Sequence, residues 1–267
     1  MPQLPQSRQQ HPLFIPLTQR HDGAITGLLR SVETQNLDIV LTKPDSLQFT
    51  WLASSAESFV KREEEIATYQ AEVEAARDQE ARTGTAALAG RIILRVGPCM
   101  TEYENLAEGH LFSGSTQSAL IACERNQGCF GHWGRPFAFH ARILDKLGRS
   151  EEARDVSRHA LSNALCTLGD DVDEICSLAQ TERPKLVDKL ELWSEGKLTD
   201  EELRRSNGMD TRSPQETALK RAASLLDLCV AAPDRYSYDT TRRDVAERYL
   251  EAGYSSLSSY VDPDETI

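Results

Sequence analysis

Cysteine and histidine residues gather in the middle of this 267-residue chain, and such side chains can ligate metals or act as nucleophiles. Cys123, Cys129 and His132 could supply three ligands to a zinc ion, with His140 or His110 as the fourth. Structural zinc sites usually separate paired cysteines by two to four residues. Five residues separate Cys123 from Cys129, so the spacing does not match and we predict no metal site.

A nucleophilic enzyme needs a cysteine or serine beside a histidine and an orienting acid. Cys129, His132 and Asp145 are the set that comes nearest to this requirement, and they define the enzyme alternative for this chain. The sequence has no Gly-x-Ser-x-Gly segment, which would mark a nucleophile on a strand-to-helix turn. We therefore predict no catalytic residue and a protein that is not an enzyme.

Glycine and acidic residues are also grouped, without forming a catalytic or nucleotide-binding motif. The glycines between Gly109 and Gly134 form neither a Gly-x-Gly-x-x-Gly segment nor a phosphate-binding loop, so we predict no nucleotide and no other cofactor. The pairs Asp170-Asp171 and Glu201-Glu202 lie at predicted helix starts, where carboxylates favour the positive end of the helix dipole.

The composition limits the kinds of partner. Hydrophobic residues make up 39% of the chain and charged residues 27%, which favours a packed core over general disorder. The formal net charge is −12, and this disfavours nucleic acid as a ligand because affinity for phosphates comes from Lys and Arg. No apolar run approaches the roughly 20 residues of a transmembrane helix.

The first residues give little sign of targeting. Residues 1–12 are rich in Gln and Pro, lack the apolar core of a secretory signal and carry Arg8 as their one basic residue, so they make a poor transit peptide. We expect them to be disordered. The six cysteines include no Cys-x-x-Cys pair and are predicted to be reduced, partly buried thiols.

Residues 13–53 have the pattern of a small β-rich subdomain. His21-Asp22-Gly23 and Pro44-Asp45 are turn signals between short apolar runs. Three or four antiparallel strands would leave an apolar face exposed, and a helix packed on that face is the simplest cover. The strand candidates are Leu13 to Leu17, Ala24 to Leu29, Asp38 to Leu41 and Leu47 to Leu52.

Residues 54–267 are predicted to form a helical domain. Its first helix, Glu57 to Arg82, has a narrow apolar seam at Phe59, Ile66 and Val73, and its opposite face has i,i+4 ion pairs such as Glu57–Lys61 and Asp78–Arg82. Further helices are predicted at 86–96, 101–112, 116–126, 135–147, 150–165, 172–180, 184–195, 200–206, 214–230, 240–252 and 256–261.

Residues Gly134 to Thr167 have the pattern of a tetratricopeptide repeat, a helix pair of about 34 residues with small residues at the contact. A weaker echo lies at Ala246 to Gly253, so we predict an irregular stack of antiparallel helices. Trp133, just before the repeat, is predicted to pack inward. The small positions are Ala141, Gly148, Ala153 and Ala160, and the large ones are Phe137 and Leu144.

The first helix of this repeat carries the predicted partner-binding residues. With Phe137 as the anchor, its inner face presents Arg135, Ala138, Arg142, Asp145 and Lys146. Three cations on one face form a local positive patch on an acidic protein, which suggests a partner with an acidic peptide or tail. The alternative is that Arg142 and Lys146 pair with acids of neighbouring helices.

The segments Cys129 to Phe137, Leu147 to Arg149, Thr167 to Gly169 and Tyr249 to Gly253 resemble a family of tetratricopeptide-like proteins from plants and algae, many of them assigned to the chloroplast. The resemblance implies a helical scaffold in the chloroplast, either in the stroma or attached to a larger complex. A cytoplasmic protein is the alternative.

The fold class predicted here is α+β and mostly α, with a small N-terminal antiparallel sheet and a tetratricopeptide-like helical stack. The predicted function is protein–protein interaction, as a scaffold, adaptor or assembly factor. Arg135, Arg142, Asp145 and Lys146 are the expected contacts. A fixed structural subunit of a large organellar complex is the main alternative, and the helix at Glu57 to Arg82 would then contact neighbours.

Overall fold

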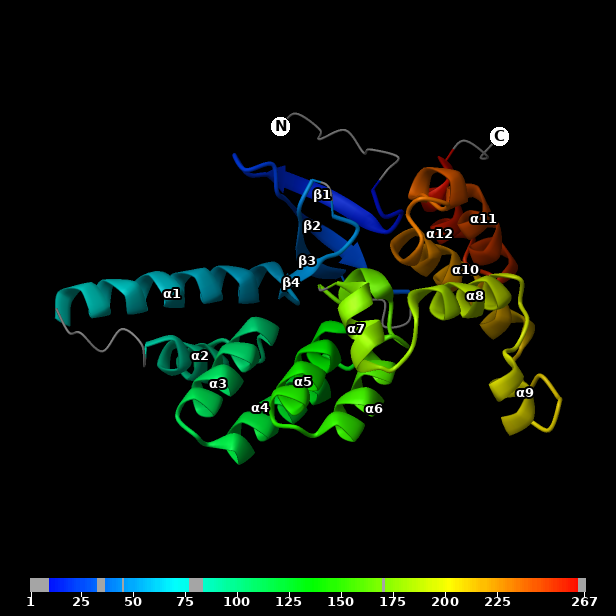
Figure 1. The fold of residues 1–267 in the computed structure, drawn as a ribbon. Coiled ribbons are helices and arrows are strands. Elements are labelled where there is room, and N and C mark those ends of the chain that lie inside the picture. Colours follow the sequence, from blue (N-terminus) through cyan, green and yellow to red (C-terminus); the bar gives the residue numbers. More distant parts are fainter. Residues whose placement is uncertain (1–9, 33–36, 45, 77–83, 170, 264–267) are drawn as a thin grey trace.

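The chain folds into a four-stranded sheet followed by a series of packed helix pairs, which confirms the predicted fold class (Figure 1). The computed structural model describes the chain except residues 1–9, 33–36, 45, 77–83, 170 and 264–267. No helix in the described part of the chain is long and apolar enough to cross a bilayer.

The sheet is an antiparallel meander in the order β1-β2-β3-β4. Each strand lies on one of the apolar runs predicted from the sequence, and the β1–β2 turn includes Gly23 at a φ of +84°, a conformation that favours glycine. Asp45 of the second predicted turn lies outside the described residues. The strands are β1 Phe14–Gln19, β2 Ile25–Arg30, β3 Leu37–Thr42 and β4 Thr50–Ala53.

The inner face of the sheet packs on helices. Val40 pairs with Trp51 across β3 and β4, and Leu29 pairs with Asp38 across β2 and β3, so these side chains share one face. Leu29, Val40 and Trp51 are buried in the core that the helices also form, and Trp51 stacks edge-on against Phe130 at 4.7 Å between ring centroids. Helices therefore cover this face, as predicted.

Helix α1 (Ala56–Ala76) follows β4 and packs on α2 (Gly84–Arg95). The predicted Glu57–Lys61 ion pair forms at 2.7 Å, whereas the Asp78–Arg82 pair lies outside the described residues. In its described part α1 buries no residue completely, because one narrow apolar seam is all that it offers its neighbours.

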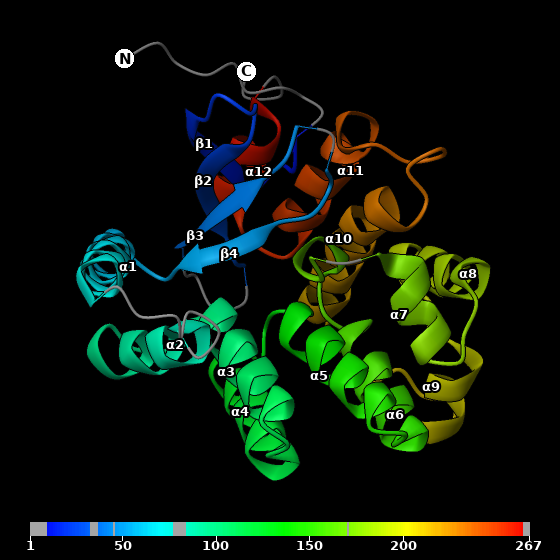
Figure 2. The ribbon, with the colours of Figure 1, turned by 60° about the vertical axis from the view of Figure 1, so that its left-hand side comes forward.

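Two antiparallel helix pairs follow, α3 (Met100–Phe112) with α4 (Thr116–Cys129), and α5 (Arg135–Lys146) with α6 (Ser150–Ala160). Figure 2 shows α2 to α6 side by side beneath the sheet. In the predicted repeat, Gly148 takes a φ of +73° at the turn. The predicted small residues Ala141, Ala153 and Ala160 are all buried where α5 and α6 meet.

Two predicted helix ends differ clearly from the structure. The helix predicted to end at Asn126 continues to Cys129. The helix expected to run to Leu165 ends at Ala160, and a separate 3-10 turn, η1 (Leu165–Thr167), follows it. Two distant partners hold this turn: Asp227 accepts a hydrogen bond from the Leu165 amide at 2.7 Å, and the Cys166 carbonyl accepts one from the Phe49 amide at 2.8 Å.

The remaining helices build the C-terminal part. Ala246 and Tyr249 of the weaker repeat echo are buried, and Ser213 and Glu216 form a capping box at the start of α10. These helices are α7 (Val172–Leu178), α8 (Arg183–Ser194), α9 (Asp200–Arg205), α10 (Pro214–Ala231), α11 (Tyr238–Glu251) and α12 (Ser255–Val261).

The sheet and the C-terminal helices share one hydrophobic core. Arg242 of α11 donates hydrogen bonds to the carbonyls of Gln10, at 3.2 Å, and Val261, at 3.0 Å. It thereby ties the segment before β1 to α12. Residues 1–9 of the range expected to be disordered lie outside the described residues, whereas His11 and Pro12 are buried.

Candidate partner-binding surface

The four predicted contact residues lie on α5, at the centre of the helical part. Gly134 precedes this helix, and a Cβ there would come within 2.8 Å of the Leu168 side chain, so the helix start packs tightly on the η1 segment. Asp145 and Lys146 are exposed at the C-terminal end of α5. Arg135 and Arg142 are half-buried.

Arg135 is engaged within the molecule. Its Nε and Nη2 atoms donate to the two carboxylate oxygens of Glu104, each at 2.8 Å, and its Nη1 atom lies 3.5 Å from the Gly169 carbonyl oxygen. Glu104 is buried on α3, and paired geometry of this kind is strong and directional. Arg135 therefore fixes α5 to α3 and to the segment after η1.

Arg142 lies one step further along the same helix and faces α7, where its Nε atom is 3.4 Å from Oε1 of Glu174. Arg142 thus makes the kind of ion pair that the sequence left open as the alternative, and Arg135, for which no such pair was predicted, makes one with Glu104. Lys146 makes no ion pair with any residue that the structure describes. Of the four predicted contact residues, Asp145 and Lys146 are therefore the ones that a partner reaches most directly.

The cysteine and histidine residues of the enzyme alternative have separate neighbours. The Cys129 thiol is exposed and lies 4.0 Å from the Tyr103 hydroxyl, whereas His132 lies 3.5 Å from the carboxylate of Asp38. His140 is buried on α5, and this burial lowers its pKa below the usual value. Among the described residues, no three metal-ligating side chains come together.

Asp38 is a structural centre that sequence reasoning missed. Its carboxylate accepts hydrogen bonds from two indole groups, Nε1 of Trp51 at 3.3 Å and Nε1 of Trp133 at 3.1 Å. Trp133 is 1% exposed, which confirms its predicted inward packing. The signal in the sequence is an acid at an inward position of an apolar strand, and it does not reveal the partner 95 residues away.

Other ionisable groups beneath the surface also serve packing. Burial raises the pKa of the Asp227 carboxyl to about 7 and that of the Cys229 thiol to about 11, so this thiol is mostly protonated and unreactive. The Tyr238 hydroxyl has no hydrogen-bond partner among the described residues. Cys99, Cys123, Cys166, Cys176 and Cys229 are buried free thiols, and Cys129 is an exposed one.

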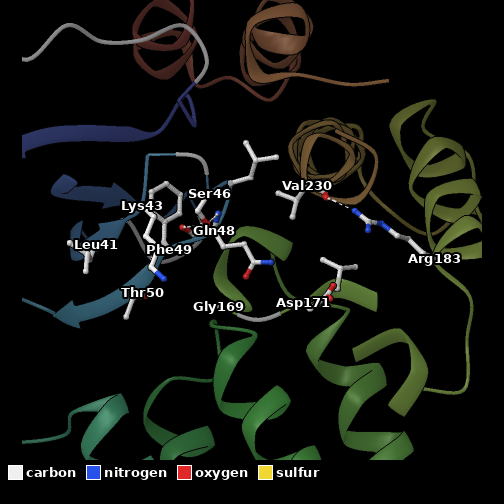
Figure 3. A pocket seen from close by; sticks show the side chains of 12 residues that line it. Leu41, Lys43, Ser46, Gln48, Phe49, Thr50, Gly169, Asp171, Arg183 and Val230 are labelled. Carbon is white, nitrogen blue, oxygen red and sulfur yellow. Dashed lines mark hydrogen bonds between the residues drawn. The ribbon is translucent and has the colours of Figure 1, made fainter. Parts of the chain in front are cut away.

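A hollow of about 490 Å³ lies where the β3–β4 connection meets the helices (Figure 3). On the helical side it is lined by Gly169, Asp171 and Val172, and by Arg183 and Val230. Arg183 donates to the carbonyls of Ala231, at 2.6 Å, and Val230, at 3.3 Å, so it caps the C-terminal end of α10. The hollow was not predicted from the sequence.

Two family models match parts of the helical region. Residues 100–182, which include α3 to α7, match the family model of the PAB middle domain. Residues 193–264, which include α9 to α12, match that of the PAB C-terminal domain. The chain is thus a mostly helical protein with PAB middle and C-terminal domains behind an N-terminal sheet.

A particular relative spans nearly the whole chain. Over 266 residues the chain is 29% identical to Protein IN CHLOROPLAST ATPASE BIOGENESIS, chloroplastic, from Arabidopsis thaliana, and the match covers 94% of this chain and 78% of the relative. The chain is a distant homologue of that plant protein. The plant and chloroplast parts of the resemblance therefore hold for the relative, and the assignment to tetratricopeptide repeats stays a prediction.

Proposed function

We propose that this protein is an assembly factor in the biogenesis of the chloroplast ATPase. The observation that carries the proposal is the 29% identity over 94% of the chain to a chloroplastic protein named for that process. The match covers the sheet as well as the helices of this chain, and not one helix pair alone. The role requires protein partners and places the chain in the chloroplast.

The fold supports a binding role. The helix pairs present broad surfaces, and the pattern of their buried residues serves helix packing. The cysteine and histidine residues that could have formed an active site have separate neighbours within the described structure. Assembly factors act by holding a partner in a competent arrangement, which needs a complementary surface and no reacting group.

The contact surface we propose is the exposed end of α5, with Lys146 and Asp145 outermost and Arg142 beside them. Arg135 supports the surface from within through Glu104. The ion pair between Arg142 and Glu174 is long at 3.4 Å, and half of the Glu174 side chain is exposed, so Glu174 is the member of this pair that a partner reaches more easily.

The experiment replaces the gene in its own organism with variants and measures assembled chloroplast ATPase on native gels. Loss of the protein should lower the assembled complex, and the wild-type gene should restore it. The double variant Asp145→Lys, Lys146→Glu should restore it poorly, whereas the control Lys185→Glu, on an exposed lysine of α8, should restore it fully. Normal assembly without the protein would overturn the role.

The fixed-subunit alternative makes a different prediction for the same gels. A permanent subunit would migrate with the mature ATPase in a constant ratio. An assembly factor should migrate with intermediates and be absent from the mature complex. Constant co-migration with the mature enzyme would replace our proposal with the structural role.

A further inference from the structure

The outer face of the sheet is apolar. Cross-strand pairing places Ile39 opposite Leu28, and Leu41 opposite Thr26 and Thr50, on the face turned away from Val40 and Trp51. Ile15 pairs with Leu28 and Leu37 pairs with Arg30 on the same face. An antiparallel sheet with one face on the core normally alternates to polar residues outside, whereas the outer face here mixes aliphatic side chains with Thr26, Thr50 and Arg30.

Part of this face is open in the described structure, although Ile39 at its centre is buried, with 7% of it exposed. Ile15, Leu28, Ile39 and Leu41 belong to neither hydrophobic cluster of the described residues, whereas their inward neighbours do. Leu37 is 45% exposed, and Leu17, at the β1 bulge, is 56% exposed. Figure 1 shows α1 leaving the end of β4 and extending away from the sheet.

The apolar face runs into the hollow beside the helices. Leu41, Lys43 and Thr50, at one end of the face, also line that hollow, where Leu47, Val172 and Val230 continue the apolar surface. Figure 3 shows Leu41 and Thr50 on the sheet side and Val230 on the helical side. The outer face of the sheet and this space of about 490 Å³, which is large enough for bulky side chains, therefore form one continuous surface, called the groove below.

Cations border this groove although the protein is acidic. Arg20 and Lys43 lie at one end of the sheet and Arg30 at the other, and all three are exposed. None of them makes an ion pair with a residue that the structure describes. Within the described part of residues 10–53 the acids are Asp22, in the β1–β2 turn, and the buried Asp38.

We propose that this groove, formed by the outer face of the sheet and the adjoining hollow, binds an amphipathic helix of a partner protein whose apolar stripe is flanked by acidic residues. Helix-in-groove binding places such a stripe on the aliphatic side chains, and the flanking carboxylates then meet Arg20, Arg30 and Lys43. A second copy of this chain is the poorer occupant, because face-to-face packing would bring the same cations together. The proposal is independent of the α5 surface.

Two synthetic helical peptides of about 18 residues test the groove directly on the full-length purified protein. Both carry the same leucine stripe, and one has Glu and the other Lys at the flanking positions. Fluorescence anisotropy at low salt should show the Glu peptide binding at least about tenfold more tightly. The variant Arg30→Glu, Lys43→Glu should reverse this order.

A second pair of variants locates the binding. The double variant Leu37→Ser, Leu41→Ser should lower the affinity of the protein for the Glu peptide by about tenfold or more. The control Leu94→Ser with Phe112→Ser removes apolar side chains that are 88% and 86% exposed on α2 and α3, and it should bind as the wild type does. Equal binding of the two peptides, or equal loss in the control, would overturn the proposal. So would a dimer of the free protein that Leu37→Ser with Leu41→Ser abolishes.

Discussion

At the scale of single residues, Asp38 connects the sheet to the segment that leads into α5. It is 5% exposed, and its two oxygens serve one tryptophan from β4 and one from the loop before α5. Buried indole N–H groups need an acceptor, and a carboxylate can serve both at once. The position of α5 relative to the sheet therefore depends on one side chain.

Replacing Asp38 by Ala should lower the free energy of unfolding by about 2–4 kcal/mol, because two buried donors lose their acceptor. Asp38→Asn should lower it less, since one oxygen remains to accept from one indole. Urea unfolding followed by circular dichroism measures both effects. The exposed Asp145→Ala is the control, and a loss for Asp38→Ala no larger than for this control would contradict the role.

His11 makes folding sensitive to acid. Burial, and to a smaller extent the charge of Arg242, lowers the pKa of His11 in the folded state to about 3. In the unfolded chain a histidine has a pKa near 6.5. Between pH 6.5 and about pH 3 the unfolded state therefore binds more protons than the folded state, and the free energy of unfolding decreases as the pH falls.

The His11→Gln variant isolates this contribution. Between about pH 7.5 and pH 5 the wild type should lose about 2 kcal/mol of stability relative to His11→Gln. Asp227 contributes with the opposite sign, because its raised pKa favours the folded state as the pH falls, and the comparison cancels this term since both proteins retain it. The exposed His21→Gln should track the wild type. A pH-independent difference for His11→Gln would show that the folded histidine is not held neutral.

At the scale of elements, most strands and helices follow from local pattern. The alternation at Ala24 to Leu29 and the helical spacing at Arg135 to Leu147 each gave an element within a few residues of the observed one. The helix after Ser150 was overextended because its end is decided by Asp227 and Phe49, whose contacts with η1 span 62 and more than 100 residues. Local sequence carries no record of such contacts.

For the candidate site, the sequence predicts which residues share a helix but not which residues of other helices they contact. The sequence placed Arg135 and Arg142 on one helix face, and the structure keeps them on α5. Their partners Glu104 and Glu174 come from α3 and α7, so the ion pairs depend on how helices pack and not on spacing along the chain. The apolar outer face of the sheet was likewise hidden, because register decides which alternate residues stand together.

Helix α1 is held by ion pairs more than by buried area. Arg62 pairs with Glu102 at 2.7 Å, and Arg91 pairs with both Glu65 and Glu72. Arg91→Gln should therefore increase amide hydrogen exchange severalfold over residues 57–72, with little change in α5 and α6. High salt should act in the same direction, because most of these charges are partly exposed.

The matched control for α1 is Arg205→Gln, which breaks an exposed i,i+4 pair with Glu201 on α9. It should leave exchange in α1 as in the wild type. Unchanged exchange over residues 57–72 in Arg91→Gln would mean that the half-buried seam of Phe59 and Ile66 is enough to hold the helix.

At the scale of the whole molecule, the sheet and most helices share one core and Arg242 joins the two ends of the described chain. The division into residues 13–53 and 54–267 remains a prediction. We expect a single unfolding transition in urea, with the same midpoint by circular dichroism and by the fluorescence of the buried Trp51, Trp133 and Trp193. Separate midpoints would show that one part unfolds first.

We propose that the protein binds chloroplast ATPase subunits during assembly and is released from the mature enzyme. Pulse labelling of newly made chloroplast ATPase subunits, followed by capture of this protein at successive times, tests it most directly. For an assembly factor, we expect labelled subunits to associate with the protein early and then to move into mature ATPase that lacks it. Labelled subunits that never associate with the protein, or a protein that stays in the mature enzyme, would contradict the assembly-factor role.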